Sequence, residues 1–205
     1  MIYIQIKRKC VNVNISDYFK NNIFIEFNSE QLDKIKKCNN IKYDIKDKII
    51  TNIPTNIIKI VFEKRFNLNI QSYLHSNIYV IYFGSEFNQE VNNLPAKLEQ
   101  LFFGINFNQK VNNLPLGLKK IFFGYEFNQS VDMLPESLEL ISFAGCFNQD
   151  ISNLPFGIKH IRILGYIFNH SIDSLPDSVE IIELNYKYHI KINKLPKNLL
   201  SKRFQ

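Results

Sequence analysis

One short phrase occurs four times in this chain at an interval of 20 residues. Each copy begins with Phe-Asn-Gln and runs through Val or Ile to Leu-Pro, as in residues 87–95. The four copies begin at Phe87, Phe107, Phe127 and Phe147. A fixed step of this length is typical of a solenoid, in which each unit buries its apolar face by stacking on its neighbours. The repeat therefore constrains the fold more than any other feature of the sequence.

Apolar residues recur at fixed positions within every unit. Counted from the proline, they fall three, six, eight, twelve, sixteen and nineteen residues later; after Pro95 they are Leu98, Leu101, Phe103, Phe107, Val111 and Leu114. The spacing Leu-x-x-Leu-x-Phe is typical of a leucine-rich-repeat strand. Side chains alternate along a strand, so positions six and eight point into the core and positions five, seven and nine point out.

A unit of 20–21 residues leaves little length for a helix on the return path after the strand. We therefore predict a mostly β fold, a leucine-rich-repeat-like right-handed solenoid of about seven 20–21-residue repeats over residues 50–200. Residues 1–49 lack the repeat, and their alternating apolar residues predict a small β-rich N-terminal cap with one short helix near residues 28–38. Residues 201–205 are assigned to a basic tail.

Three features of the unit have structural interpretations. The Phe of each Phe-Asn pair is expected to point inward and to stack on its equivalents as a spine along the solenoid. The Asn side chain is expected to bond to backbone groups of the turn or of the next coil. A glycine nine residues past the proline, at Gly84, Gly104 and Gly124, is expected to let the chain turn sharply out of the strand.

The combination of Phe-Asn-Gln, Leu-Pro and Leu-x-x-Leu-x-Phe-Gly resembles the FNIP repeat, a leucine-rich-repeat relative found in social amoebae and in giant viruses of amoebae. The resemblance covers roughly residues 50–200, although these units lack a Pro-Gly-like pair before Leu-Pro. It implies a protein-interaction module with no known chemistry. Many viral relatives carry an F-box ahead of the repeats, but residues 1–52 read as β and show no F-box. A role as ubiquitin-ligase adaptor is therefore not implied.

Cysteine content and hydropathy favour an intracellular protein. Three cysteines, Cys10, Cys38 and Cys146, are too few and too scattered for a disulfide framework or a zinc site. The first residues lack the pattern of a signal peptide, and no stretch approaches the ~20 apolar residues of a membrane span. We expect no membrane association and a cytoplasmic location, which for a viral protein is the host cytoplasm.

The histidines give no sign of catalysis. The four are His75, His160, His170 and His189. None lies at ligand or triad spacing from a cysteine or carboxylate, and the chain has no phosphate-binding glycine loop. We therefore expect a non-enzymatic protein without catalytic residues, cofactor or bound metal.

The concave face of a solenoid is its default binding surface. Its outward positions predict an aromatic stripe on adjacent strands, followed by a polar half. Aromatic residues dominate interface hot spots, so the stripe indicates a site for a protein partner. The alternatives are that the rings pack only on each other or, with the register shifted by one, face inward. The candidate partner-binding residues are Tyr82, Gln100, Phe102, Lys120, Phe122, Leu140, Ser142, His160, Arg162 and Glu183. This arrangement is compatible with a monomer.

The uneven charge distribution leaves a second hypothesis open. The net charge is +6, yet residues 85–184 carry 6 basic and 12 acidic residues, whereas residues 185–205 carry 6 basic and no acidic residues. A groove built from acidic repeats is expected to repel phosphate, which disfavours nucleic acid as its partner. The alternative function is weak nucleic-acid or anionic-surface binding through the basic ends, with Lys187, Lys191, Lys194, Lys197, Lys202 and Arg203.

Overall fold

The computed structural model describes residues 58–62, 64–69, 74 and 76–205 with their side chains, and before them the backbone of four short strands. Those strands are β1 (Tyr3–Ile4), β2 (Phe24–Phe27), β3 (Lys42–Asp44) and β4 (Ile49–Thr51). Strands β1 and β2 join the main sheet, and β3 pairs with β4 in an antiparallel hairpin. The short helix predicted near residues 28–38 lies outside the described residues.

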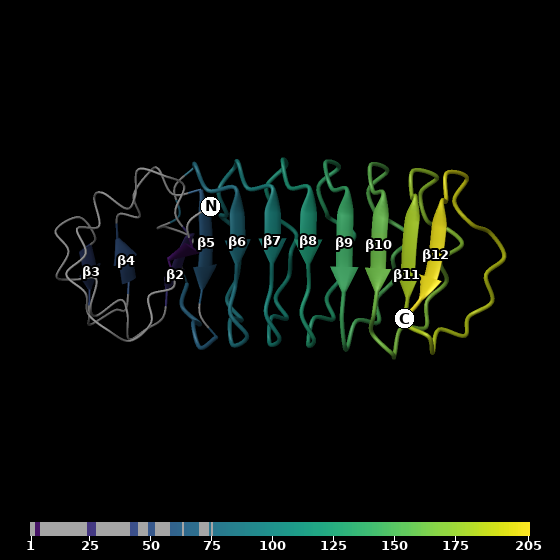
Figure 1. Ribbon diagram of the computed structural model, residues 1–205, viewed down its shortest axis with the longest axis horizontal. Helices are drawn as coiled ribbons and strands as arrows, with labels where there is room; N and C mark the ends of the chain where they lie inside the picture. Colours follow the sequence, from purple (N-terminus) through teal and green to yellow (C-terminus); the bar gives the residue numbers. More distant parts are fainter. Residues whose placement is uncertain are drawn as a thin grey trace.

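One short parallel strand marks each coil of the solenoid, and the strands lie side by side in chain order (Figure 1). The sheet runs β1-β2-β5-β6-β7-β8-β9-β10-β11-β12. Its remaining strands are β5 (Lys59–Phe62), β6 (Val80–Tyr82), β7 (Gln100–Phe102), β8 (Lys120–Phe122), β9 (Leu140–Phe143), β10 (His160–Ile163), β11 (Ile181–Leu184) and β12 (Ser201–Phe204). The part of the chain that the structure describes contains no helix. The predicted mostly β solenoid is confirmed.

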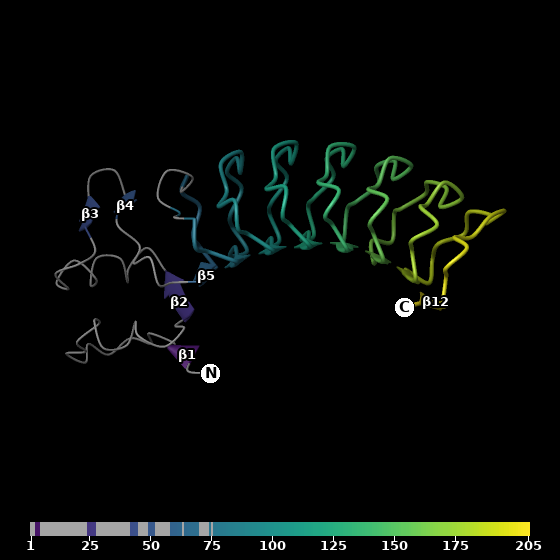
Figure 2. The same cartoon turned by 90° about the horizontal axis from the view of Figure 1, so that it is seen from above.

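The strand register follows the repeat. Ile81 pairs with Leu101, and Leu101 pairs with Ile121, so equivalent positions of successive units lie opposite one another. These three side chains are fully buried, whereas the residues before and after them in each strand are half-buried. Positions six and eight therefore point inward and positions five and seven point outward, as the spacing predicts. In Figure 2, β5–β12 line the inner side of an arc, and the return segments form its outer side.

Two parallel columns of phenylalanine rings fill much of the core. The Phe-Asn rings stack from coil to coil with centroids 6.1 Å apart between Phe87 and Phe107 and between Phe107 and Phe127. A second column stands at the end of the strands, where Phe103 lies 3.6 Å from Phe107 within its own coil. Phe107 and Phe127 are fully buried. The predicted inward spine is confirmed, and it continues through Phe168 to Tyr188 at the C-terminal end.

The asparagine beside each spine ring bridges two coils. Its Oδ1 accepts a hydrogen bond from the backbone N–H of the equivalent asparagine one coil later, at 2.9 Å from Asn108 to Asn88 and 3.0 Å from Asn128 to Asn108. The same oxygen also accepts from the glutamine of the next phrase, as in Gln109 Nε2 to Asn88 Oδ1 at 3.0 Å. Each side chain thus satisfies a backbone donor that the strand ladder does not reach. This confirms the structural interpretation of Phe-Asn-Gln.

The glycine that follows each regular strand has a different role from the predicted one. Among the described glycines only Gly145 has a positive φ, at 35°, so Gly104 and Gly124 do not need a left-handed turn. A Cβ on Gly124 would instead lie 1.8 Å from the carbonyl oxygen of Gly104. The predicted reason for glycine at these positions, a sharp turn out of the strand, is therefore wrong. Glycine is required there because successive coils approach each other too closely for any side chain.

Residues 201–205 are not a free tail. Ser201–Phe204 forms β12, which pairs in parallel with β11 in the register of all other units. The pattern of burial fades here, because Lys202 and Phe204 occupy the inward positions and remain exposed. Counted from Pro196, position six is Lys202 and position eight is Phe204. The numbering of the repeat unit therefore also applies to this strand, although a lysine replaces the apolar residue at position six. The assignment of a basic tail is therefore corrected to an eighth strand in the run from β5.

Candidate functional site

Two columns of side chains cover the concave face, because each strand contributes two outward residues in matching register. One column occupies position five of each unit and the other position seven. The first consists of Lys59, Val80, Gln100, Lys120, Leu140, His160, Ile181 and Ser201. The second consists of Val61, Tyr82, Phe102, Phe122, Ser142, Arg162, Glu183 and Arg203. The second column holds the features that distinguish one half of the face from the other.

The N-terminal half of the second column is an aromatic stack. The ring centroids of Tyr82 and Phe102 lie 4.0 Å apart at an interplanar angle of 3°, and those of Phe102 and Phe122 lie 4.5 Å apart at 9°. The Lys59 ammonium lies 4.5 Å from the centroid of the Tyr82 ring, where a cation–π contact is favourable. Burial against these rings lowers the pKa of Lys59. All three rings are half-buried, so they pack on each other and still border the concave surface.

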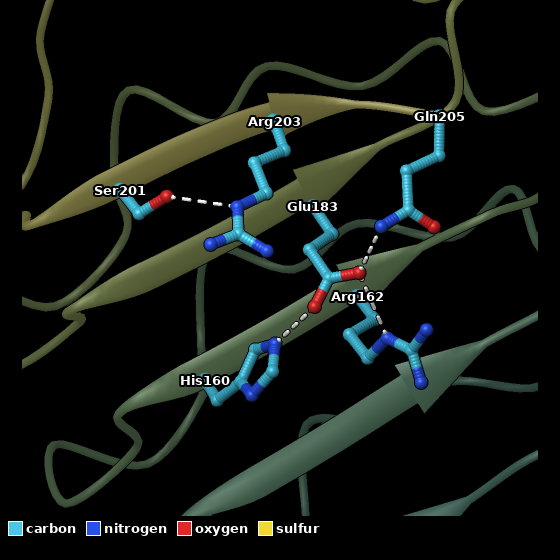
Figure 3. Close-up of polar contacts among 6 residues, drawn as sticks. All are labelled: His160, Arg162, Glu183, Ser201, Arg203 and Gln205. Atoms are coloured by element: carbon cyan, nitrogen blue, oxygen red, sulfur yellow. Dashed lines mark hydrogen bonds and ion pairs between the residues drawn. The ribbon is translucent and has the colours of Figure 1, made fainter.

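The C-terminal half of the column centres on the carboxylate of Glu183, which three side chains contact (Figure 3). His160 Nε2 lies 2.7 Å from Oε1, while Arg162 Nε donates to Oε2 at 3.1 Å and Gln205 Nε2 donates to Oε2 at 2.7 Å. Burial alone raises the pKa of Glu183, but the contacts with His160 and Arg162 outweigh it and leave this pKa lowered. Glu183 is therefore a charged, buried anchor for its neighbours.

The concave columns carry positive charge, although the repeat segment as a whole is acidic. Among their described residues, Lys59, Lys120, Arg162 and Arg203 are cationic and only Glu183 is anionic. Most acidic residues of the repeats stand on the rim and the return segments, as Glu99 and Glu139 do just before their strands. The net charge of the repeat segment thus gives the wrong sign for the concave face, because it sums side chains that point in different directions.

The structure places all ten candidate partner-binding residues on strands β6–β11, in the two outward columns. Eight of them are half-buried, but Ser142 and Glu183 are each only 7% exposed. Ser142 and Glu183 therefore contribute little to the exposed area of the concave face. Arg203, predicted only as part of the basic C-terminal end, and Gln205, which was not predicted, also join the polar half. Counting seven residues on from Pro196 would have placed Arg203 in the second column.

A third group of aromatic side chains lies on the rim where the strands end. The Tyr125 and Tyr166 hydroxyls are 3.0 Å apart, and their residues belong to coils two steps apart. The hydrogen bond with Tyr166 raises the pKa of Tyr125 to about 12. The Lys187 ammonium lies 5.7 Å from the Tyr166 ring centroid and 5.8 Å from that of Tyr186. Tyr125, Tyr166 and Tyr186 are 42%, 52% and 68% exposed, so they add aromatic surface to this rim.

The described residues contain no group of three or more His, Cys, Asp or Glu side chains that could hold a metal ion. No helix long and apolar enough to cross a membrane occurs in this part of the chain.

Comparison with known proteins finds a repeat family and a similar solved structure. The FNIP repeat model matches residues 106–146, 147–187 and 168–201. The chain is similar to CroV588, whose structure is described as a novel circular LRR protein structure, with 34% identity and a TM-score of 0.69. The alignment covers 76% of this chain and 25% of the CroV588 chain, so this chain spans about a quarter of that protein's length. No curated protein matches.

Proposed function

Because residues 106–201 are FNIP repeats within a leucine-rich-repeat-like solenoid, we propose that this chain is a non-enzymatic scaffold that binds a protein partner through its concave face. FNIP and leucine-rich repeats are scaffold types, and the outward columns of β6–β11 are the surface they present. The observation that carries the proposal is the half-buried stack of Tyr82, Phe102 and Phe122.

The stack has the properties of an interface anchor. Aromatic rings combine a large apolar area with few rotatable bonds, so little conformational entropy is lost when a partner covers them. These three rings are already held by mutual stacking, which reduces that loss further. Polar side chains continue the same column through Arg162, so an apolar centre borders a charged region. Interfaces commonly have this combination of an apolar core and a polar rim.

The variation between repeats also supports recognition by this face. Positions six and twelve repeat almost without change, as Ile or Leu and as Phe. Position seven changes from Val61 through aromatic rings to Ser142, Arg162 and Glu183. Packing explains the uniform positions, since each coil must match its neighbours. Packing does not require the outward column to vary in this way. Recognition of a partner does require such variation.

The test is a double substitution, Phe102→Ser with Phe122→Ser, compared with Phe156→Ser as control. Phe156 is 82% exposed on a return segment, so the control removes an aromatic side chain away from the concave face. Removing two stacked contacts should cost about 1–3 kcal/mol of unfolding free energy, because each aromatic pair contributes ~0.5–1.5 kcal/mol. The double variant should remain folded and lose its partner in affinity purification from host cells. A folded double variant that retains every partner would refute the proposal.

A further inference from the structure

Three cations of the concave face stand on alternate strands. Lys120 lies on β8, Arg162 on β10 and Arg203 on β12. Arg162 and Arg203 share the second column, with Glu183 between them, whereas Lys120 stands in the first column. Neighbouring strands are about 4.8 Å apart, so Arg162 and Arg203 are separated by roughly 10 Å along the sheet. The face thus presents a pair of arginines in one column and a lysine beside the aromatic stack.

The polar cluster leaves cationic donors directed outward. Both carboxylate oxygens of Glu183 are engaged by His160, Arg162 and Gln205. Among the described residues, Arg162 uses only Nε in a hydrogen bond, and Figure 3 shows its two terminal nitrogens directed away from Glu183. Arg203 is likewise held only through Nε, by Ser201 Oγ at 3.2 Å. The Lys120 ammonium makes no hydrogen bond or ion pair within the part of the chain that the structure describes.

The geometry of the aromatic stack favours acceptor groups over nucleobases. The rings of Tyr82, Phe102 and Phe122 lie nearly parallel along the solenoid, so their faces cover one another. Their edges border the concave surface. An aromatic ring carries positive partial charge at its edge and negative charge on its face. Ring edges therefore attract carbonyl and carboxylate oxygens, whereas a nucleobase would need an open ring face on which to stack.

We propose that the concave face binds an extended acidic segment of a protein partner, whose carboxylates contact Arg162, Arg203 and Lys120. This inference rests on the function proposed above and adds the chemistry of the partner. The segment's backbone carbonyls and apolar groups lie over the aromatic edges. A polyproline II segment advances ~3.1 Å per residue with three residues per turn, so carboxylates at every third position recur at ~9.3 Å. This spacing matches the interval between Arg162 and Arg203.

Binding is measured by fluorescence anisotropy of labelled 12-residue peptides with the full chain. The probes are four repeats of Glu-Pro-Pro, the same peptide with Gln or Lys in place of Glu, and a 12-nucleotide oligo(dT). The Glu peptide should bind at least tenfold more tightly than the Gln peptide and more tightly than oligo(dT). Arg162→Ala and Arg203→Ala should each weaken it fivefold or more, since both remove charge-assisted hydrogen bonds.

The matched control is Lys159→Ala. Lys159 is exposed just before β10, so its loss changes the net charge by the same amount without removing an outward strand residue. It should weaken Glu-peptide binding less than twofold. Arg203→Ala guards against a folding defect, because Arg203 contacts Ser201 and not the Glu183 carboxylate. Equal binding of the Gln or Lys peptide would overturn the proposal, as would equal effects of Lys159→Ala and Arg203→Ala.

The outcomes separate this inference from the function on which it rests. If Phe102→Ser with Phe122→Ser abolishes partner capture while the Glu peptide binds no better than the Gln peptide, the concave face binds a protein of other chemistry. In that case only the acidic segment is refuted. If oligo(dT) binds more tightly than the Glu peptide and depends on Arg162, the face recognises nucleic acid and both proposals fail.

Discussion

The coils that carry β6–β8 and those that carry β9–β11 share one buried core and differ on the surface. In both regions position six is a fully buried Ile or Leu, from Ile81 to Ile182. The first region has three-residue strands, glycine after each strand and aromatic rings in the second outward column. The second has four-residue strands, Ala144, Leu164 and Asn185 after them, and polar residues in that column.

The comparison shows which constraints the repeat imposes. A buried position tolerates change if the replacement fills the same space, as when Ile163 and Leu184 continue the column of Phe83, Phe103 and Phe123. A position of close backbone contact holds another residue only where the local backbone differs, as in the second region, whose strands are one residue longer. An outward position is bound by neither condition. Function is therefore expected where the two regions diverge while the core remains the same.

The largest effect is expected in the shared core. Phe107 is fully buried between Phe87 and Phe127, so Phe107→Ala leaves a cavity in the ring column. Truncating a buried Phe costs ~3–5 kcal/mol. Phe156→Ala, at an 82% exposed site, should change stability by less than about 0.5 kcal/mol. Urea unfolding monitored by circular dichroism measures both. Similar urea unfolding midpoints for the two variants would show that the column of Phe-Asn rings does not stabilise the core.

The next effect tests the close approach of coils in the first region. A Cβ on Gly124 would lie 1.8 Å from the Gly104 oxygen, whereas a Cβ on Gly117 would meet nothing closer than 3.7 Å. Gly124→Ala should therefore cost about 1–3 kcal/mol, as overpacking does. Gly117→Ala should be neutral or slightly stabilising, because it only restricts the unfolded chain. If Gly124→Ala unfolds at the same temperature as Gly117→Ala, the coils are less tightly spaced than this structure has them.

The fold could be predicted from the sequence because its determinants repeat. The units share the same strand, the same inward positions and the same Phe-Asn bridge, so one register accounts for strands β5–β12. The glycine interpretation failed because sequence alone cannot distinguish a turn that needs positive φ from a contact that excludes Cβ. The assignment of 201–205 to a tail failed because Lys202 breaks the apolar pattern at position six. Pairing with β11 still forms the strand there.

The candidate site was predicted in position but not in its interactions. Alternation within a strand placed Phe102 and Phe122 outward, and the structure agrees. Alternation could not show that Glu183 would be buried under His160, Arg162 and Gln205, because those contacts depend on side-chain reach across two strands. Net charge per segment also failed, since it carries no information on which face a charge occupies. Whether these residues bind a partner stays a prediction.

A smaller effect is expected in the polar half. Glu183→Gln removes the charge and one acceptor from three contacts, which should cost about 1–2 kcal/mol. Because the folded pKa of Glu183 is lowered, its charged form stabilises the fold above the ordinary Glu pKa. This contribution is lost as pH falls from about 4.3 through the lowered pKa.

The wild type should therefore exceed Glu183→Gln in unfolding free energy at pH 6, and the gap should close in acid. Glu180→Gln is the control, since Glu180 is the rim residue just before β11 and makes no side-chain ion pair among the described residues. Chemical unfolding at several pH values gives the comparison. A gap that does not change between neutral and acid pH would show that the Glu183 carboxylate contributes no charged contacts.

The smallest effect concerns a side-chain hydrogen bond that links the two regions at their rim. Tyr125 follows β8 and Tyr166 follows β10, and their hydroxyls meet 3.0 Å apart across the intervening coil. Gly145 stands beneath this bridge, where a Cβ would lie 2.5 Å from the Tyr125 ring.

The bond with Tyr166 raises the pKa of Tyr125 to about 12, so the neutral phenol is favoured. The contribution of this bond to stability is lost as pH rises from about 10 through 12. Tyr166→Phe should return the pKa of Tyr125 towards 10 and change the melting temperature least of these variants. Carbon-13 NMR of labelled tyrosine, assigned with Tyr125→Phe, follows the titration directly. Tyr186→Phe should leave it unchanged, because Tyr186 contacts Lys187 rather than Tyr125. If Tyr125 titrates near 10 in the wild type, the two hydroxyls are not paired.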